Sequence, residues 1–221
     1  LHPRVRRQRQ MCIRDRWYVV DSEPGSYLYC GLSRDASKEE ILERINNNTI
    51  TDILNKIEVK AGDVVMVKAG TIHAIGAGVF ICEIQQNSNC TYRMYDYDRR
   101  DKFGNPRELH VKKALDVVDN HKYIKDNKTE VVIARNEHFT EERLVQCKYF
   151  EVYKYDVNDE AKITVDEASF VSVLFINGSG TIETDDYEKT MEFKAGDSFF
   201  VSAGLRSIII KGQATMVVTR V

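Results

Sequence analysis

The sequence predicts an all-β protein made of two jelly-roll β-domains, with a small helical insert and a short bridging helix. Short β-prone runs separated by Gly, Pro and Asn turns recur over most of the chain, whereas helical spacing is confined to a few segments. The stretch KAGDVVMVKAG at 60–70 returns as KAGDSFFVSAG at 194–204, with seven of eleven positions identical, which indicates two copies of one β-unit. Many short strands are typical of sandwiches and barrels, and a jelly roll protects the sheet edges.

Length and composition limit the domain number and the function class. The 221 residues fit one large or two small domains, and we favour two compact units. With 43% hydrophobic residues, 30% charged residues and a net charge of −2, the composition argues against disorder, a membrane span and a nucleic-acid surface. The five cysteines are odd in number and lack CxxC spacing, which argues against a disulfide framework and favours a reducing cytoplasm.

The first sixteen residues, LHPRVRRQRQMCIRDR, differ in style from the rest of the chain. They contain six arginines and no acidic residue before Asp15. A basic arm that binds nucleic acid is one interpretation of such a run. The abrupt change at Trp17 favours the other interpretation, a non-native leader at 1–16 that takes no part in the fold.

The helical insert follows two predicted strands at 17–20 and 26–31. In SRDASKEEILERINNN, Ser37 stands three residues before Glu40, as in a capping box, and apolar residues recur at helical spacing. This pattern predicts a helix over about 37–46. A shorter helix is expected near 50–56, so the insert covers about 35–56.

Strands resume after the insert. IEV, DVVMV and GVFICEIQQ read as strands, and the alternating aromatic run TYRMYDYD predicts another at 91–97. RELHVKKALDVVD has helical spacing and predicts the bridging helix, and the polar stretch HKYIKDNKTE reads as a linker. We therefore place the domain boundary at 129/130. Beyond it we expect the strands KYFEVYKYDV, KITV, FVSVLFI, GTIET, SFFVSA, SIIIK and TMVVTRV, with Asn-Gly and Gly-Ser-Gly turns.

The repeat helps to interpret His73. A lone histidine on an apolar strand is usually a packed or surface side chain. The first copy of the repeat continues Thr71-Ile72-His73, whereas the second has Ser207 at the equivalent position. Because only one of two equivalent turns carries the histidine, a ligand role becomes the better interpretation.

A family resemblance extends this interpretation. The stretch G-D-x-x-x-V-x-A-G-T-I-H at 62–73 resembles the second conserved motif of the cupins, with Lys68 where proline is usual. Together with EIQQ at 83–86 and YRMYDYDR at 92–99, the region 69–119 closely resembles type I mannose-6-phosphate isomerases in their short bacterial form. The resemblance covers roughly 17–221. It implies a catalytic cupin domain at 17–129 and a cupin-like β-domain at 130–221.

The resemblance implies one Zn²⁺ per complete subunit. The family holds this metal with a Gln and a His of a Q-V-H-P stretch, a Glu just before the following W-Y, and a His in a T-x-H-A turn. His73 matches the last, and Asp15, two residues before Trp17, stands at the Glu position. The Q-V-H-P stretch belongs upstream of Trp17, where this chain has the arginine-rich run. We therefore expect an N-terminally truncated isomerase that lacks two metal ligands.

Two further residues receive catalytic roles from the resemblance. Glu83 aligns with a carboxylate of the family's pocket and is a candidate for proton transfer, the alternative being an ion pair or the orientation of a ligand. Arg93 aligns with the family's active-site arginine. Its planar guanidinium can hold phosphate or sugar oxygens in a bidentate manner, the alternative being a salt bridge to Asp96 or Asp98.

Other polar residues of this region support weaker interpretations. Asn89 stands where many relatives carry Asp, which weakens any acid–base role at that position. Arg99, Arg100 and Lys102 form a basic cluster that can attract a phosphosugar, although such runs are more often solvated loops. His110 begins the bridging helix and reads as a capping or surface residue.

The leading hypothesis is therefore a zinc-dependent isomerase that interconverts mannose 6-phosphate and fructose 6-phosphate through an enediol. Its partner would be a small phosphosugar, with no nucleic acid and no membrane. A non-catalytic cupin that binds sugar phosphates is the first alternative, because the Q-V-H-P ligands are absent. An inactive fragment of the isomerase is the second. Zinc content separates the enzyme from the binding protein.

Overall fold

The computed structural model describes residues 15–85, 91–97, 99–125, 131–184 and 187–221. These residues fall into two compact units, an N-terminal unit up to Lys125 and a C-terminal unit beyond it. The expected domain boundary at 129/130 and most of the expected leader lie outside the described residues. Within the described ranges, none of the helices has the length and hydrophobicity needed to cross a bilayer.

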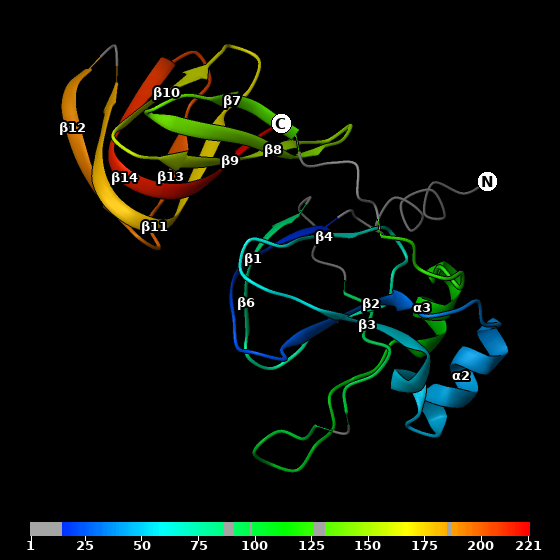
Figure 1. Cartoon of the computed structure of the whole chain (residues 1–221). Helices are drawn as coiled ribbons and strands as arrows, with labels where there is room; N and C mark the ends of the chain where they lie inside the picture. Colours follow the sequence, from blue (N-terminus) through cyan, green and yellow to red (C-terminus); the bar gives the residue numbers. More distant parts are fainter. Residues whose placement is uncertain (1–14, 86–90, 98, 126–130, 185–186) are drawn as a thin grey trace. The chain divides into compact units, whose positions relative to one another are not determined.

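The N-terminal unit is built from two three-stranded antiparallel sheets, with the strand orders β4-β1-β6 and β3-β2-β5 (Figure 1). Buried Trp17 and Val65 of the first sheet pack in one apolar cluster with Leu28 and Cys30 of the second, so the two sheets face each other across a core. The bounds are β1 (Asp15–Ser22), β2 (Tyr27–Leu32), β3 (Leu54–Glu58), β4 (Val64–Val67), β5 (His73–Ile75) and β6 (Val79–Gln85). Because β1 begins at Asp15, it includes the last two residues of the expected leader.

The helical insert is confirmed, with one correction. Helix α2 (Lys38–Asn46) begins after Ser37, whose side chain accepts a hydrogen bond from the Glu40 N–H at 3.1 Å. The Glu40 carboxylate instead accepts from Arg34 and Arg44, so only half of the capping box forms. The second expected helix, near 50–56, is a single 3₁₀ turn, η1 (Ile50–Ile53). It stops there because the next residues form β3, paired with β2.

The bridging helix is confirmed as α3 (Val111–Val117). It lies beside α2 in Figure 1. Both helices contribute to a second apolar cluster, together with η1 and the ends of β2 and β3. Its buried members are Leu32, Ala36, Ile41, Ile45, Ile50, Ile53, Leu54 and Val118. The insert and the bridging helix thus cover one end of the N-terminal unit.

The expected aromatic strand at 91–97 is wrong: residues 91–96 form no strand. The main chain of Arg93 bonds to His110 instead of to a neighbouring strand. Its carbonyl accepts from the His110 N–H at 2.7 Å, and its N–H donates to the His110 Nδ1 at 3.3 Å. Tyr97 then turns the chain with a φ of 54°. The segment therefore forms an irregular wall next to α3.

The repeated Lys-Ala-Gly-Asp stretch makes the same turn in both units. In each copy the glycine N–H donates to a strand carbonyl at 2.8 Å, and the aspartate carboxylate accepts from the lysine N–H at 2.9 Å. Both glycines have φ near 90°, a conformation that favours glycine. The repeat therefore encodes turn geometry. The donor–acceptor pairs are Gly62–Val19 and Lys60–Asp63 in the first copy, and Gly196–Phe175 and Lys194–Asp197 in the second.

The C-terminal unit is one large antiparallel sheet, in the order β12-β11-β14-β9-β8-β7, with β10 paired to β14 and β13 paired to β11 (Figure 1). A cluster of buried aliphatic and aromatic residues in its core includes the stacked rings of Phe175 and Phe193. The bounds are β7 (Val131–Arg135), β8 (Phe139–Gln146), β9 (Glu151–Val157), β10 (Glu160–Val165), β11 (Val171–Thr184), β12 (Tyr187–Lys194), β13 (Ser198–Val201) and β14 (Arg206–Arg220). The all-β class is confirmed.

Two pairs of expected strands are in fact single long strands. The runs FVSVLFI and GTIET join as β11, and SIIIK and TMVVTRV join as β14. The expected Asn-Gly turn does not form: Asn177 and Gly178 pair with β14, and a β-bulge between Phe175 and Asn177 precedes them. Gly178 has a φ of 89°, and a Cβ there would lie 1.9 Å from the Gln213 carbonyl oxygen. Glycine is thus required by close packing within the sheet and not by a hairpin.

Candidate functional site

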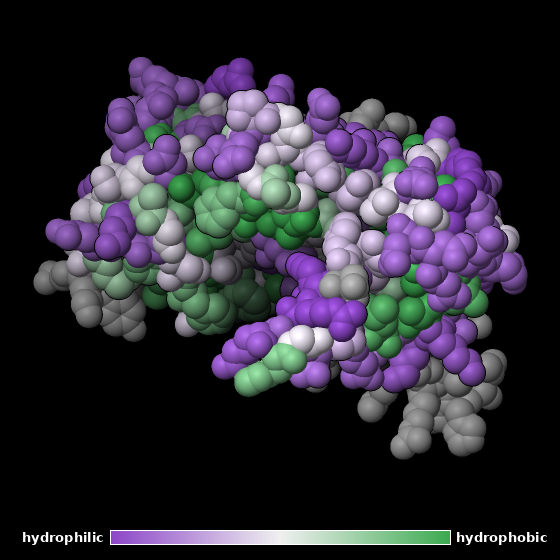
Figure 2. Space-filling model, turned by 90° about the horizontal axis from the view of Figure 1, so that it is seen from below, coloured by the Kyte–Doolittle hydropathy of each residue, from purple (hydrophilic) through white to green (hydrophobic). Residues whose placement is uncertain are grey.

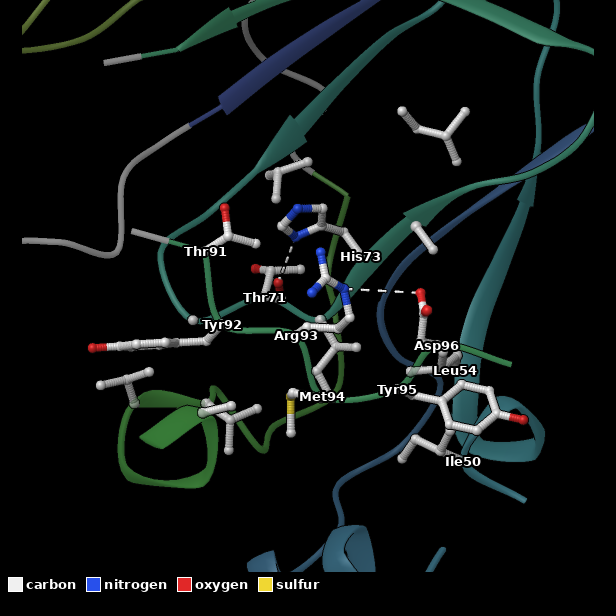
Figure 3. A pocket seen from close by; sticks show the side chains of 18 of the residues that line it. Ile50, Leu54, Thr71, His73, Thr91, Tyr92, Arg93, Met94, Tyr95 and Asp96 are labelled. Atoms are coloured by element: carbon white, nitrogen blue, oxygen red, sulfur yellow. Dashed lines mark hydrogen bonds and ion pairs between the residues drawn. The ribbon is translucent and has the colours of Figure 1, made fainter. Parts of the chain in front are cut away.

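The N-terminal unit contains a cavity of about 590 Å³. Its walls come from the turn between β4 and β5, from the end of β6, from the irregular segment 91–97 and from α3 (Figure 3). The lining side chains include His73, Glu83 and Arg93, so the structure brings three of the four predicted site residues into one cavity. Four lining side chains are cationic and two are anionic, which favours an anionic ligand.

His73 begins β5 and is exposed to the cavity. Its Nδ1 lies 2.8 Å from the carbonyl oxygen of Thr71. Since a carbonyl can only accept, Nδ1 carries a proton, and in the neutral imidazole Nε2 then keeps its lone pair for a ligand. The equivalent position of the second repeat, Ser207, is 2% exposed. The two equivalent positions thus differ in exposure: His73 faces the cavity, whereas Ser207 is buried.

Trp17 connects His73 to Glu83. The indole ring is 1% exposed, and its Nε1 donates to the Glu83 Oε1 at 2.8 Å. The edge of the same ring system meets the His73 ring, with centroids 5.3 Å apart and planes at 73°. The contact follows from sheet register, because Trp17 of β1 is paired directly with Glu83 of β6. One buried side chain thus fixes the orientation of two polar groups at the cavity wall.

Arg93 reaches into the cavity from the irregular segment, and its guanidinium points toward the His73 ring (Figure 3). Its Nη1 donates to the Glu108 carbonyl oxygen at 3.2 Å, and its Nε lies 3.8 Å from the Asp96 Oδ1. The salt bridge that competed with a binding role is therefore present, and Arg93 also lines the cavity. A guanidinium has five N–H donors, so these contacts leave donors for a ligand.

Asp96 collects two more arginines at the same wall. Its side chain is 6% exposed, and Oδ1 pairs with Arg99 and also with Arg107, the latter at 3.4 Å. Both arginines line the cavity. The loop 99–107 that carries them appears in Figure 2 as a mainly hydrophilic ridge. Arg99 therefore belongs to the site, while Arg100 and Lys102 of the predicted basic cluster are not among the cavity-lining residues.

A catalytic zinc site needs about three protein ligands and an open position. The residues that the structure describes bring one imidazole, that of His73, to the cavity, and they contain no group of three or more His, Cys, Asp or Glu placed to hold a metal. The main chain of Asp15 pairs with Gln85 of the cavity wall, but its side chain, like Asn89 as a whole, lies outside the described part. The described residues by themselves therefore do not complete a zinc site.

Sequence reasoning gave no site role to Arg107 of the cavity wall, nor to three other residues in or beside the cavity. Trp17 served only as a boundary marker, Asp96 only as a competitor for Arg93, and His110 as a capping or surface residue. The structure shows no side-chain cap from His110, whose ring instead accepts from the Arg93 N–H. The available signal was modest: Trp17 is the sole tryptophan, and Asp96 follows Arg93 at a spacing of three.

Comparisons with known proteins agree on one family. A profile described as "Mannose-6-phosphate isomerase, cupin domain" matches residues 140–221. The chain is 39% identical over 210 residues to the putative mannose-6-phosphate isomerase YvyI of Bacillus subtilis, covering 93% of this chain and 63% of that protein. It is 32% identical over 213 residues to the mannose-6-phosphate isomerase ManA of the same organism, covering 92% and 62%.

A solved structure shares the fold. The crystal structure of the mannose 6-phosphate isomerase from Bacillus subtilis superimposes with a TM-score of 0.85 at 36% identity, covering 95% of this chain and 65% of that chain. The chain therefore spans a little under two thirds of the length of the relatives that it matches.

Proposed function

The chain belongs to the mannose-6-phosphate isomerase family, and from this membership we propose that its cavity binds a phosphorylated sugar and takes part in interconverting mannose 6-phosphate and fructose 6-phosphate. The observation that carries the proposal is the meeting of His73, Glu83 and Arg93 in one cavity with excess positive charge. These residues come from separate segments of the chain, and the cavity size suits a small ligand.

The proposed reaction moves a proton between C1 and C2 of the sugar through an enediol. Glu83 is the proposed proton carrier, because the Trp17 N–H fixes one of its oxygens at 2.8 Å and a positioned carboxylate can act as a general base. Arg93 is proposed to hold sugar or phosphate oxygens with its free N–H donors. The Nε2 of His73, left as an acceptor by the Thr71 contact, would bind a sugar hydroxyl or a metal.

Zinc dependence stays a prediction that rests on the family resemblance. A metal ion would supply a Lewis acid that polarises the sugar oxygens. Asp15 is proposed as a second ligand because it stands at the position of the family's Glu, two residues before Trp17, and its main chain begins β1 beside the cavity-lining Gln85.

The test is turnover of mannose 6-phosphate by the purified chain, with zinc content measured on the same sample. Glu83→Gln should lower kcat by roughly 10²–10⁴-fold if Glu83 transfers the proton, and Arg93→Gln should raise KM. Glu43→Gln is the matched control, because Glu43 is an exposed residue of α2. Turnover that is equal in all three variants would reject the proposed roles.

A second candidate function is binding of sugar phosphates without catalysis. The observation that favours it is the single imidazole at the cavity among the described residues. Saturable binding of mannose 6-phosphate without turnover, at any zinc concentration, would select this alternative. Turnover with about one zinc per chain would reject it.

A further inference from the structure

Asp96 and its three arginines form an unusual cluster, of which the proposed chemistry uses only Arg93. A single carboxylate, 6% exposed, lies against Arg93, Arg99 and Arg107, whose side chains are 25%, 61% and 47% exposed. All three contacts converge on the same oxygen, Oδ1. The other oxygen, Oδ2, is buried and has no hydrogen-bond partner among the described residues.

This arrangement is poorly suited to stabilising the fold. Removing a carboxylate from water carries a large desolvation cost, and burial of an ion pair often brings no net stability. A buried oxygen without a partner adds to that cost. Three guanidinium groups around one carboxylate also carry two positive charges more than that carboxylate can neutralise. Such a cluster is typical of a binding site, where positively charged side chains are held in place at a cost in fold stability.

The excess positive charge faces the cavity. Arg99 and Arg107 both line it, they are the more exposed members of the cluster, and each keeps N–H donors beyond its contact with Asp96. A long arginine side chain has several rotamers, and holding it in one of them before a ligand arrives reduces the entropic cost of binding. A fixed carboxylate at the base of the guanidinium groups provides this preorganisation.

We propose that Asp96 is a positioning residue that holds Arg93, Arg99 and Arg107 as a preformed clamp for the anionic group of the cavity's ligand. This inference rests on the proposed function only for the identity of the ligand, a phosphorylated sugar. The clamp itself is a property of the described residues. Arg107, which sequence reasoning did not single out, belongs to it.

For the change in phosphate affinity on removing the Asp96 charge, positioning of the arginines and simple electrostatic attraction predict opposite signs. Asp96→Asn removes a negative charge from the cavity wall, so electrostatic attraction alone would make inorganic phosphate bind more tightly. If Asp96 positions the arginines, the same variant binds phosphate at least about tenfold more weakly, because the clamp must be ordered by the ligand itself. Calorimetric titration of the full chain with inorganic phosphate shows whether Asp96→Asn raises or lowers the phosphate affinity. Asp116→Asn, an exposed change on α3, is the control for net charge.

A double-mutant cycle separates loss of arginine positioning from general damage to the fold. Arg107 is about half exposed, so Arg107→Gln should fold normally and weaken phosphate binding. If Asp96 acts through the arginines, Asp96→Asn should weaken binding much less in the Arg107→Gln background than in the wild type. Additive losses would mean that the Asp96 variant damages the fold generally, and would overturn the proposal.

The outcomes separate this inference from the proposed function. Wild-type chain that binds mannose 6-phosphate, with equal or tighter binding in Asp96→Asn, overturns the role of Asp96 alone. Phosphate binding that depends on Asp96, without any preference for mannose 6-phosphate over inorganic phosphate, overturns the phosphosugar assignment and keeps the clamp. A wild-type chain that binds neither anion overturns the clamp.

Discussion

Gly70 fixes the approach of α3 to the turn that carries His73, and replacing it with alanine tests that packing. Gly70 has a φ of 79°, and a Cβ there would lie 2.6 Å from the Val117 carbonyl oxygen and 2.9 Å from the Asp119 nitrogen. The Gly70 carbonyl also accepts a hydrogen bond from the Asp119 N–H at 2.9 Å. An alanine must therefore move the chain that follows α3.

Gly62 of the same unit is the matched control, because it has a φ of 91° and a Cβ there would meet no described atom within 4 Å. The left-handed conformation costs an alanine about 1–2 kcal/mol at either site. Gly70→Ala adds about 1–3 kcal/mol for the steric overlap with backbone atoms. We thus expect Gly70→Ala to lower the free energy of unfolding by about 2–5 kcal/mol and Gly62→Ala by about 1–2 kcal/mol.

Urea unfolding followed by the fluorescence of Trp17 measures both variants. Trp17 is the sole tryptophan and is buried in β1 of the N-terminal unit, so the signal reports that unit alone. With a slope of roughly 1–3 kcal/mol per M urea, the two midpoints should differ clearly. Equal midpoints for Gly70→Ala and Gly62→Ala would refute the packing argument.

Three further predictions concern the site, a surface pair and the core. Trp17→Phe keeps an aromatic ring but removes the N–H that donates to Glu83. Turnover of mannose 6-phosphate should therefore fall, while the secondary structure measured by circular dichroism persists. Unchanged turnover would show that Trp17 is not part of the site. A hydrogen bond and the charge of Asp159 raise the pKa of His138 above 6.5, and the same contact lowers the pKa of Asp159 below 3.8. The pair therefore stabilises the fold between these two ordinary pKa values. This stabilisation is lost as the pH rises through the folded pKa of His138 or falls through that of Asp159. Asp159→Asn should return the His138 titration toward 6.5 by NMR, and an unmoved titration would contradict the pairing. Among the described residues, one core cluster of the C-terminal unit contains sixteen buried residues, whereas two clusters of the N-terminal unit contain eight and seven. The central amides of the C-terminal unit should therefore exchange hydrogen more slowly, and equal protection would reject this ranking.

The sequence predicted the fold well where interactions between residues close in the chain determine the local structure. Ser37 caps α2 because a serine hydroxyl reaches the N–H three residues ahead. The repeated Gly-Asp turns also recur as expected, since the hydrogen bond from the lysine N–H to the aspartate carboxylate spans only three residues in each copy. These features need little tertiary information.

Prediction failed where distant segments decide. The alternation of Tyr92, Tyr95 and Tyr97 suggested a strand, but the Arg93 backbone bonds to His110, seventeen positions away. Gly178 suggested a turn, whereas it follows a bulge, pairs with Ala214 of β14 and packs closely against the Gln213 carbonyl oxygen. The local sequence pattern is the same for the predicted element and for the observed one, and only contacts with a distant strand or helix distinguish the two.

The candidate site shows the same division. The asymmetry of the repeat singled out His73, and the family resemblance singled out Glu83 and Arg93. The contact between Trp17 and Glu83 spans sixty-six positions and depends on the register of β1 and β6, which composition and spacing do not reveal. The role of Asp96 likewise depends on Arg107 returning to it from the far end of a loop.

The most direct test of the account is whether mannose 6-phosphate enters this cavity. The ring resonances of the five histidines can be followed by NMR during a titration with the sugar phosphate. If mannose 6-phosphate enters the cavity, we expect a saturable shift of the His73 resonance, because His73 lines the cavity, and no shift of His138, which is paired with Asp159 on the C-terminal unit. A His73 resonance that stays fixed while another site saturates would contradict it.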